Sequence, residues 1–111
     1  MIDVVEFPAL ANYVVHIEVT RDIRKAMKKY AQTKDIDHPK GTEAVVVHVG
    51  GKPFSFVFLS TNATVGNVAH EMWHVIQNLF EYVDADLENE MVAYHLGYLV
   101  NKGVELVRRT R

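Results

Sequence analysis

The chain has 111 residues, 49% of them hydrophobic and 23% charged, which is enough for one domain with a core of its own. The net charge of −2 gives no electrostatic basis for binding nucleic acid or an anionic membrane surface. The absence of cysteine excludes disulfides and thiolate metal ligands. No apolar run reaches membrane-spanning length, and the first residues lack a secretory signal pattern, so we expect a cytoplasmic protein.

The first third of the chain predicts strands and one helix. Residues 1–11 are apolar but irregular, and Pro8 limits strand pairing, so they are interpreted as a covering segment or a short edge strand. Residues 13–19 alternate between apolar and mixed positions, which is typical of a half-buried strand. Thr20 is the expected N-cap of an amphipathic helix, with Asp22 in its first turn. Its apolar positions are Ile23, Ala26, Met27 and Tyr30.

The remaining chain predicts a hairpin followed by two helices. Residues 33–42 carry Asp, Pro and Gly and are interpreted as a loop. Two apolar runs, 44–49 and 54–60, flank a Gly-Gly-Lys-Pro turn and predict a hairpin. Residues 64–83 predict a long helix capped by Thr64 or Asn62, and residues 87–107 a second one.

The order β-α-β-β-α-α predicts a single α+β domain, 1–111, with a small mixed sheet of three or four strands packed by helices. A strand, a crossover helix and a second strand normally form a right-handed parallel pair. We therefore expect the strand at 13–19 to pair with the first strand of the hairpin, and the hairpin to add an antiparallel strand.

The motif His70-Glu71-Met72-Trp73-His74 lies within the first long helix and reads H-E-x-x-H. Residues four apart share a helical face, so both histidines can point at one metal ion. At 100° per residue they fall on the polar face, opposite the apolar arc of this helix. Glu71 lies about 100° to one side, where it can act as general base and acid for a metal-activated water.

A zinc site usually needs a third protein ligand, and Glu90 in the second long helix is the best candidate. Ala93 and Gly97 share its face and are small, so another helix can approach closely there. Tyr94, next to this face, can donate a hydrogen bond to an oxyanion or pack between helices. Poorer candidates for the third ligand are Glu88 and His95 on the helix and Asp84 and Asp86 in the loop.

These residues resemble the motif of the zincin metallopeptidases, and specifically of the gluzincin branch, in its minimal single-domain and phage-type members. His70, Glu71 and His74 match the H-E-x-x-H helix, and Glu90 matches the glutamate of the following helix. The resemblance implies a Zn²⁺ cofactor and hydrolysis of a peptide or protein substrate. It also implies that a strand within 44–60 binds extended peptide by backbone pairing.

Two alternatives stay open at this point. The chain can be a catalytically weak or latent zincin-like module that binds another protein, with Asp3, Glu6 or the Arg111 carboxylate as a fourth ligand. It can also hold a closed structural zinc, which predicts loss of folding on chelation. The sequence leaves the oligomeric state open.

Overall fold

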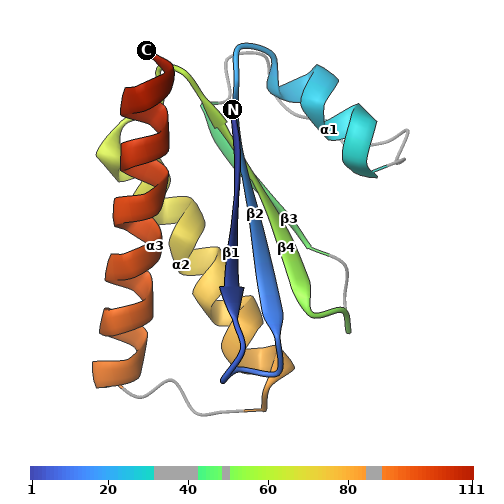
Figure 1. Cartoon of the computed structure of the whole chain (residues 1–111), viewed down its shortest axis with the longest axis vertical. Coiled ribbons are helices and arrows are strands. Elements are labelled where there is room, and N and C mark those ends of the chain that lie inside the picture. The colour runs from blue at the N-terminus through green and yellow to red at the C-terminus, as the bar shows by residue number, and fades with distance from the viewer. Residues whose placement is uncertain (32–42, 49–50, 85–88) are drawn as a thin grey trace.

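The computed structural model describes residues 1–31, 43–48, 51–84 and 89–111 (Figure 1). The elements in chain order are β1 (Ile2–Phe7), β2 (Tyr13–Thr20), α1 (Ile23–Ala31), β3 (Ala44–His48), β4 (Phe54–Ser60), α2 (Val65–Tyr82) and α3 (Asn89–Thr110). The predicted loop at 33–42, and also Val49, Gly50, Asp86, Leu87 and Glu88, lie outside the described residues. Among the described residues, no helix combines the length and apolar character needed to cross a membrane.

The four strands form one mixed sheet in the order β1-β2-β4-β3, which confirms the predicted α+β class. β1 is an edge strand antiparallel to β2. This agrees with the second of the two interpretations of residues 1–11, a short edge strand. β2 does form a parallel pair, as predicted, but the identity of its partner was predicted wrongly. β2 pairs in parallel with β4 and not with β3. β3 lies on the outer side of β4 and is antiparallel to it. The burial of β4 explains this order: Val57, Phe58 and Leu59 are fully or almost fully buried, whereas no residue of β3 is. β4 is also the longer strand, with seven residues against five, and carries larger apolar side chains, so it buries more apolar surface in the interior position than β3 would.

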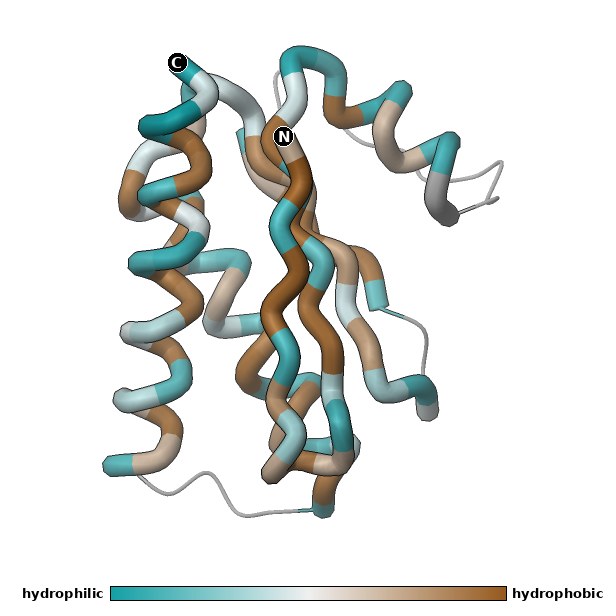
Figure 2. Tube along the Cα trace, viewed as in Figure 1, coloured by the Kyte–Doolittle hydropathy of each residue, from teal (hydrophilic) through white to brown (hydrophobic). Residues whose placement is uncertain are grey.

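Helices cover both faces of the sheet (Figures 1 and 2). α2 and α3 pack on the face that carries Tyr13, Val15 and Ile17 of β2, all fully buried. α1 packs on the opposite face, where Met27 meets Phe58 of β4. The strict alternation of β2 places one set of its side chains in the main core, as the sequence pattern predicted.

The cap of α2 is one of the predicted candidates, Thr64. Its hydroxyl accepts a hydrogen bond from the Asn67 N–H at 3.1 Å, and the Asn67 side chain accepts one from the Thr64 N–H at 2.9 Å. This reciprocal capping box fixes where the helix begins. The N-cap of α1 is Asp22 and not Thr20, which the sequence predicted. Asp22 Oδ1 accepts a hydrogen bond from the Lys25 N–H at 3.1 Å. Thr20 Oγ1 instead accepts one from the N–H of Asp22.

α3 packs on α2 and the sheet through a different face from the one that its small residues predicted. Ala93 and Gly97 are exposed, and a Cβ at Gly97 would meet no described heavy atom within 4 Å beyond the neighbouring backbone of its own helix. The close approach occurs at Gly103, where an added Cβ would lie 2.7 Å from Val68 Cγ1 and 3.1 Å from Met72 Cε. The larger apolar residues of α3 determine which face packs on α2 and the sheet. Burying Leu99 removes more apolar surface from water than burying Ala93 would.

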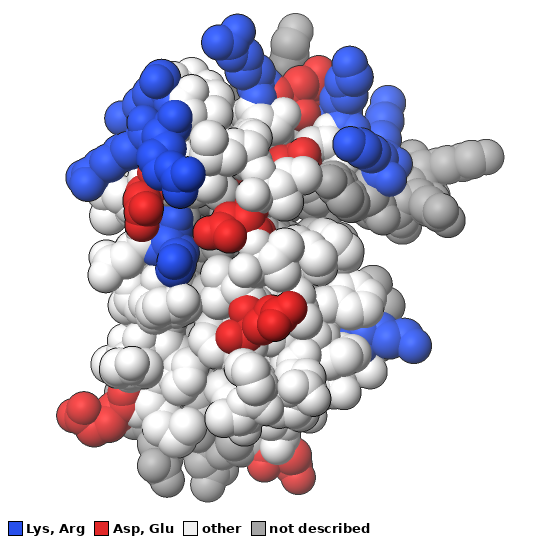
Figure 3. Space-filling view, in the orientation of Figure 1, with Lys and Arg blue, Asp and Glu red and all other residues white. Residues whose placement is uncertain are grey.

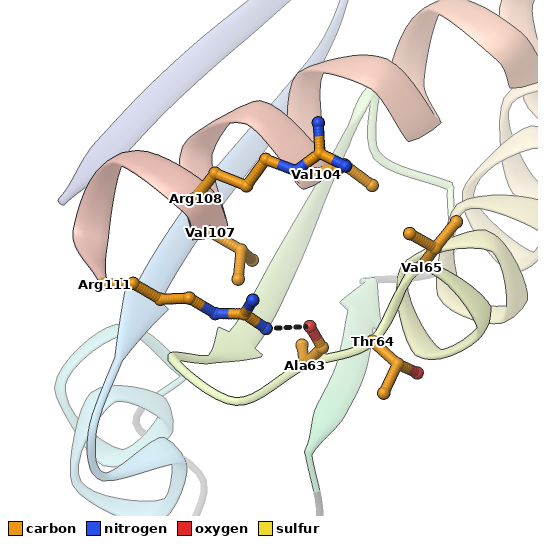
Figure 4. A pocket seen from close by; sticks show the side chains of 7 residues that line it. All are labelled: Ala63, Thr64, Val65, Val104, Val107, Arg108 and Arg111. Carbon is orange, nitrogen blue, oxygen red and sulfur yellow. Dashed lines mark hydrogen bonds between the residues drawn. The ribbon is translucent and has the colours of Figure 1, made fainter.

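The two ends of the chain meet beside the start of α2. The Met1 amine donates a hydrogen bond to the Val19 carbonyl at 3.1 Å. The Arg111 guanidinium donates to the carbonyl of Thr61 at 3.1 Å. It also donates to the carbonyl of Ala63 at 3.2 Å (Figure 4). Arg111 therefore ties the end of α3 to the loop that leads into the H-E-x-x-H helix.

Candidate metal centre

The two motif histidines lie side by side on the exposed face of α2. The Nε2 atoms of His70 and His74 are 3.3 Å apart, and their rings are nearly perpendicular at 77°. Two nitrogen ligands about 2.0–2.1 Å from a zinc ion, at a tetrahedral angle, stand roughly 3.3–3.4 Å apart. The separation of the two nitrogens therefore matches that of two ligands on one zinc ion. The same distance also permits an Nε2–H to Nε2 hydrogen bond when one ring carries the proton on Nε2.

Glu71 is half-buried on the flank of α2, between the exposed histidine face and the buried face of the helix. Its carboxylate has no hydrogen-bond or ion-pair partner within the described part of the chain. An acceptor that is not engaged by the protein is available to take a proton from a nearby water.

The structure does not bring the predicted third ligand to this pair. Glu90 is exposed in the first turn of α3, and the described residues contain no group of three histidine, aspartate or glutamate side chains that could hold a metal. Tyr94, the predicted oxyanion donor, is 75% exposed. Asp84, the described loop alternative, is exposed too.

Two other histidines are engaged elsewhere. His95 has its Nδ1 2.8 Å from the Met91 carbonyl oxygen and its ring 5.5 Å from that of Phe7. His16 on β2 stacks on Phe56 at 4.9 Å between ring centroids. Both rings are therefore in contact with other side chains of the protein.

A buried hydrogen-bond chain holds α2 against the sheet one turn beyond His74. Asn78 Nδ2 donates to the Tyr13 hydroxyl on β2, which is hydrogen-bonded to the hydroxyl of Ser55 on β4. Burial raises the pKa of Tyr13, and its hydrogen bonds to Ser55 and Asn78 partly offset this rise. The chain sets the rotation of α2, and with it the direction of the histidine face. Sequence reasoning missed it because its members lie 42 and 65 positions apart.

β3 is an edge strand of the sheet and makes direct contacts with α2. β4 pairs with only one side of β3, from Ala44 to His48. The other side carries backbone N–H and C=O groups that no described strand pairs. Such an edge can accept an extended peptide as an added strand.

Two cavities adjoin α2 at its two ends. One, of about 190 Å³, lies at the N-terminal end and is lined by Val65, Arg108 and Arg111 among others (Figure 4). The other, of about 340 Å³, lies between Lys52 in the β3–β4 turn and Asn78, Glu81 and Tyr82 near the C-terminal end. Neither of these two cavities is lined by His70 or His74, which are exposed on the surface of α2.

Comparison of the chain with protein-family models, with curated proteins and with solved structures gave no match.

Proposed function

We propose that this protein is a zinc-dependent metallopeptidase that hydrolyses peptide bonds. The observation that carries the proposal is the 3.3 Å separation of the His70 and His74 Nε2 atoms on an exposed helix face. The H-E-x-x-H spacing and the tetrahedral fit of the two nitrogens support the same metal.

In this proposal each residue has a separate task. His70 and His74 bind Zn²⁺ as neutral imidazoles through Nε2. When bound, the zinc supplies a Lewis acid and lowers the pKa of a coordinated water. Glu71 accepts a proton at its carboxylate and returns it to the leaving amine. Glu90 stays the third ligand predicted by the resemblance, and Tyr94 stays the predicted hydrogen-bond donor. Among the described residues Glu90 forms no three-ligand group with the pair, so ligation by Glu90 requires α3 to shift relative to α2.

The substrate would bind as an added strand on the open side of β3. Backbone hydrogen bonds supply most of the affinity in this mode, and side-chain pockets supply specificity. An exposed site beside an open edge suits an extended segment of a peptide or a flexible part of a protein.

A zinc titration tests the metal site. We expect one equivalent of Zn²⁺ to bind the unaltered chain, and His70→Ala or His74→Ala to weaken binding at least about 100-fold, because each removes a ligand. His48→Ala is the matched control, since His48 is exposed on β3 rather than on α2. The absence of stoichiometric zinc, or equal loss in the control, would refute the site.

Glu71→Gln tests the chemistry separately from the metal. We expect this variant to keep its zinc and to lose peptide hydrolysis by about 100-fold or more, because an amide cannot accept the proton. Glu81→Gln, an exposed position on the same helix, is the matched control and should keep full activity. Full hydrolytic activity in Glu71→Gln would exclude this residue as the base.

A second candidate function is a zincin-like module that binds another protein without cleaving it. It is favoured by the open edge of β3, together with the lack of a three-ligand group among the described residues. A tight peptide complex that shows no turnover, and that is unaffected by Glu71→Gln, would support this second function over the first.

A further inference from the structure

The side of α3 that faces away from the sheet combines small, aromatic and charged residues in one stripe. Ala93 and Gly97 leave the helix backbone accessible, and Tyr94 beside them is 75% exposed. Asn101 continues the stripe one turn further on and is exposed. Tyrosine is favoured at protein interfaces because it offers a large amphipathic surface for little loss of side-chain entropy.

The charges at the two ends of this stripe are opposite. Glu90 and Arg108 are 18 residues apart, about five turns of an α-helix, so they project from the same side of α3. Both are exposed, and neither has an ion-pair partner among the described residues. Figure 3 shows basic side chains gathered near the C-terminal end of α3 and an acidic one near its other end. The charge pattern of this stripe is therefore complementary to that of a second, identical stripe that runs antiparallel to it.

We propose that this face of α3 binds a second copy of the chain, with the two α3 helices antiparallel. A two-fold axis at the level of residue 99 places Glu90 opposite Arg108 of the second copy, twice in the dimer, and Gly97 opposite Asn101. A parallel arrangement would instead bring like charges together at both ends. Small residues at the centre allow the close approach, and the tyrosines pack on either side of it.

The contact is one helix wide, so it falls at the small end of specific interfaces. We expect a dissociation constant on the order of 10–100 µM. The H-E-x-x-H face belongs to a different helix, so the dimer leaves His70 and His74 exposed. A Glu90 that pairs with Arg108 of the second copy does not ligate the metal at the same time.

Charge reversal tests the arrangement by sedimentation equilibrium over roughly 5–500 µM protein. Glu90→Arg and Arg108→Glu should each raise the dissociation constant about tenfold or more, and the double variant should restore the dimer. Glu81→Arg, the same charge change on exposed α2, is the matched control. A double variant as weak as the singles, or a parent chain that stays monomeric throughout, would overturn the proposal.

Gly97→Gln tests the close approach without touching the charges. The space around Gly97 is open among the described residues, so the monomer should fold normally, as followed by circular dichroism, while the dimer is blocked. An unchanged dissociation constant would contradict the proposed contact. Measuring zinc affinity for Glu90→Gln separates the two roles of this residue: weakened self-association at unchanged zinc affinity assigns it to the interface, and the reverse result assigns it to the metal and refutes the salt bridge.

Discussion

Tyr13 is the residue through which the candidate site depends on the core. It is fully buried, and its hydroxyl joins Ser55 on one side and Asn78 on the other. Ser55 is itself fully buried, so its hydroxyl depends on partners within the protein. Because this one hydroxyl links β2, β4 and α2, both hydrogen bonds form at only one rotation of α2 about its axis. An apolar contact alone would be compatible with several such rotations.

Tyr13→Phe should lower the free energy of unfolding by about 1–3 kcal/mol at neutral pH, because it leaves buried polar groups with fewer partners. Urea unfolding monitored by circular dichroism measures the change. The matched control is Tyr98→Phe, which removes a hydroxyl from a side chain that is 43% exposed and should have little effect. Equal stability of Tyr13→Phe and the parent chain would contradict a structural role for the hydroxyl.

The same residue predicts a dependence on alkaline pH. Burial raises the pKa of Tyr13 in the folded state above its usual value of 10.0. As the pH rises above about 10, the unfolded chain loses this proton first, so the stabilising contribution of Tyr13 is complete below that pH and declines above it. The stability difference between the parent chain and Tyr13→Phe should therefore stay constant up to about pH 10 and narrow as the pH rises above it. A constant difference in urea unfolding across this range would exclude the linkage.

At the scale of elements, two glycines of α3 have opposite surroundings. Gly103 faces Val68 and Met72 at distances that leave no room for a methyl group, while Gly97 faces open space among the described residues. The packing of α2 on α3 therefore depends on one glycine and not on the other.

Gly97→Ala and Gly103→Ala form a matched pair on one helix. Gly97→Ala should stabilise the monomer by roughly 0.5–1 kcal/mol, because alanine loses less backbone entropy in a helix. Gly103→Ala should destabilise it by about 1–2 kcal/mol, because overpacking outweighs the same gain. Thermal unfolding at a low protein concentration measures both. A stabilised Gly103→Ala would show that Val68 can move aside.

At the scale of the whole molecule, zinc and folding should be linked if the proposed site binds. The two ligands lie on one helix, but the direction in which they point depends on the packed sheet, so the folded state should bind better than the unfolded chain. Free zinc at about 100 times its dissociation constant should add roughly 2.7 kcal/mol of stability. Differential scanning calorimetry should show a higher melting temperature with zinc, reversed by a chelator. His74→Ala should show no such shift, and an equal shift in that variant would place the zinc elsewhere.

The charge distribution belongs to this scale too. The described basic residues gather on α1, with Arg21 just before it, and on the C-terminal part of α3, apart from Lys52, while the overall net charge is only −2 (Figure 3). The net charge alone gives no sign of this gathering of basic residues, because it sums over the whole chain.

The local patterns of this chain were sufficient to predict its elements. The alternation at 13–19 predicted β2, the glycine turn separated β3 from β4, and Thr64 was one of two predicted caps of α2. The i, i+4 spacing of the motif placed both histidines on the exposed face of that helix. Such features depend on neighbours a few positions apart, whose geometry the helix or strand fixes by itself.

Other features were decided only by the tertiary structure. The choice of β4 over β3 as the parallel partner of β2, the packing of α3 through Gly103 rather than Ala93 and Gly97, and the position of Glu90 away from the histidines all depend on which apolar surfaces are buried together. Periodicity identifies an apolar face but not the surface that covers it. That pairing is a competition among all the faces of the domain, and the larger buried area prevails.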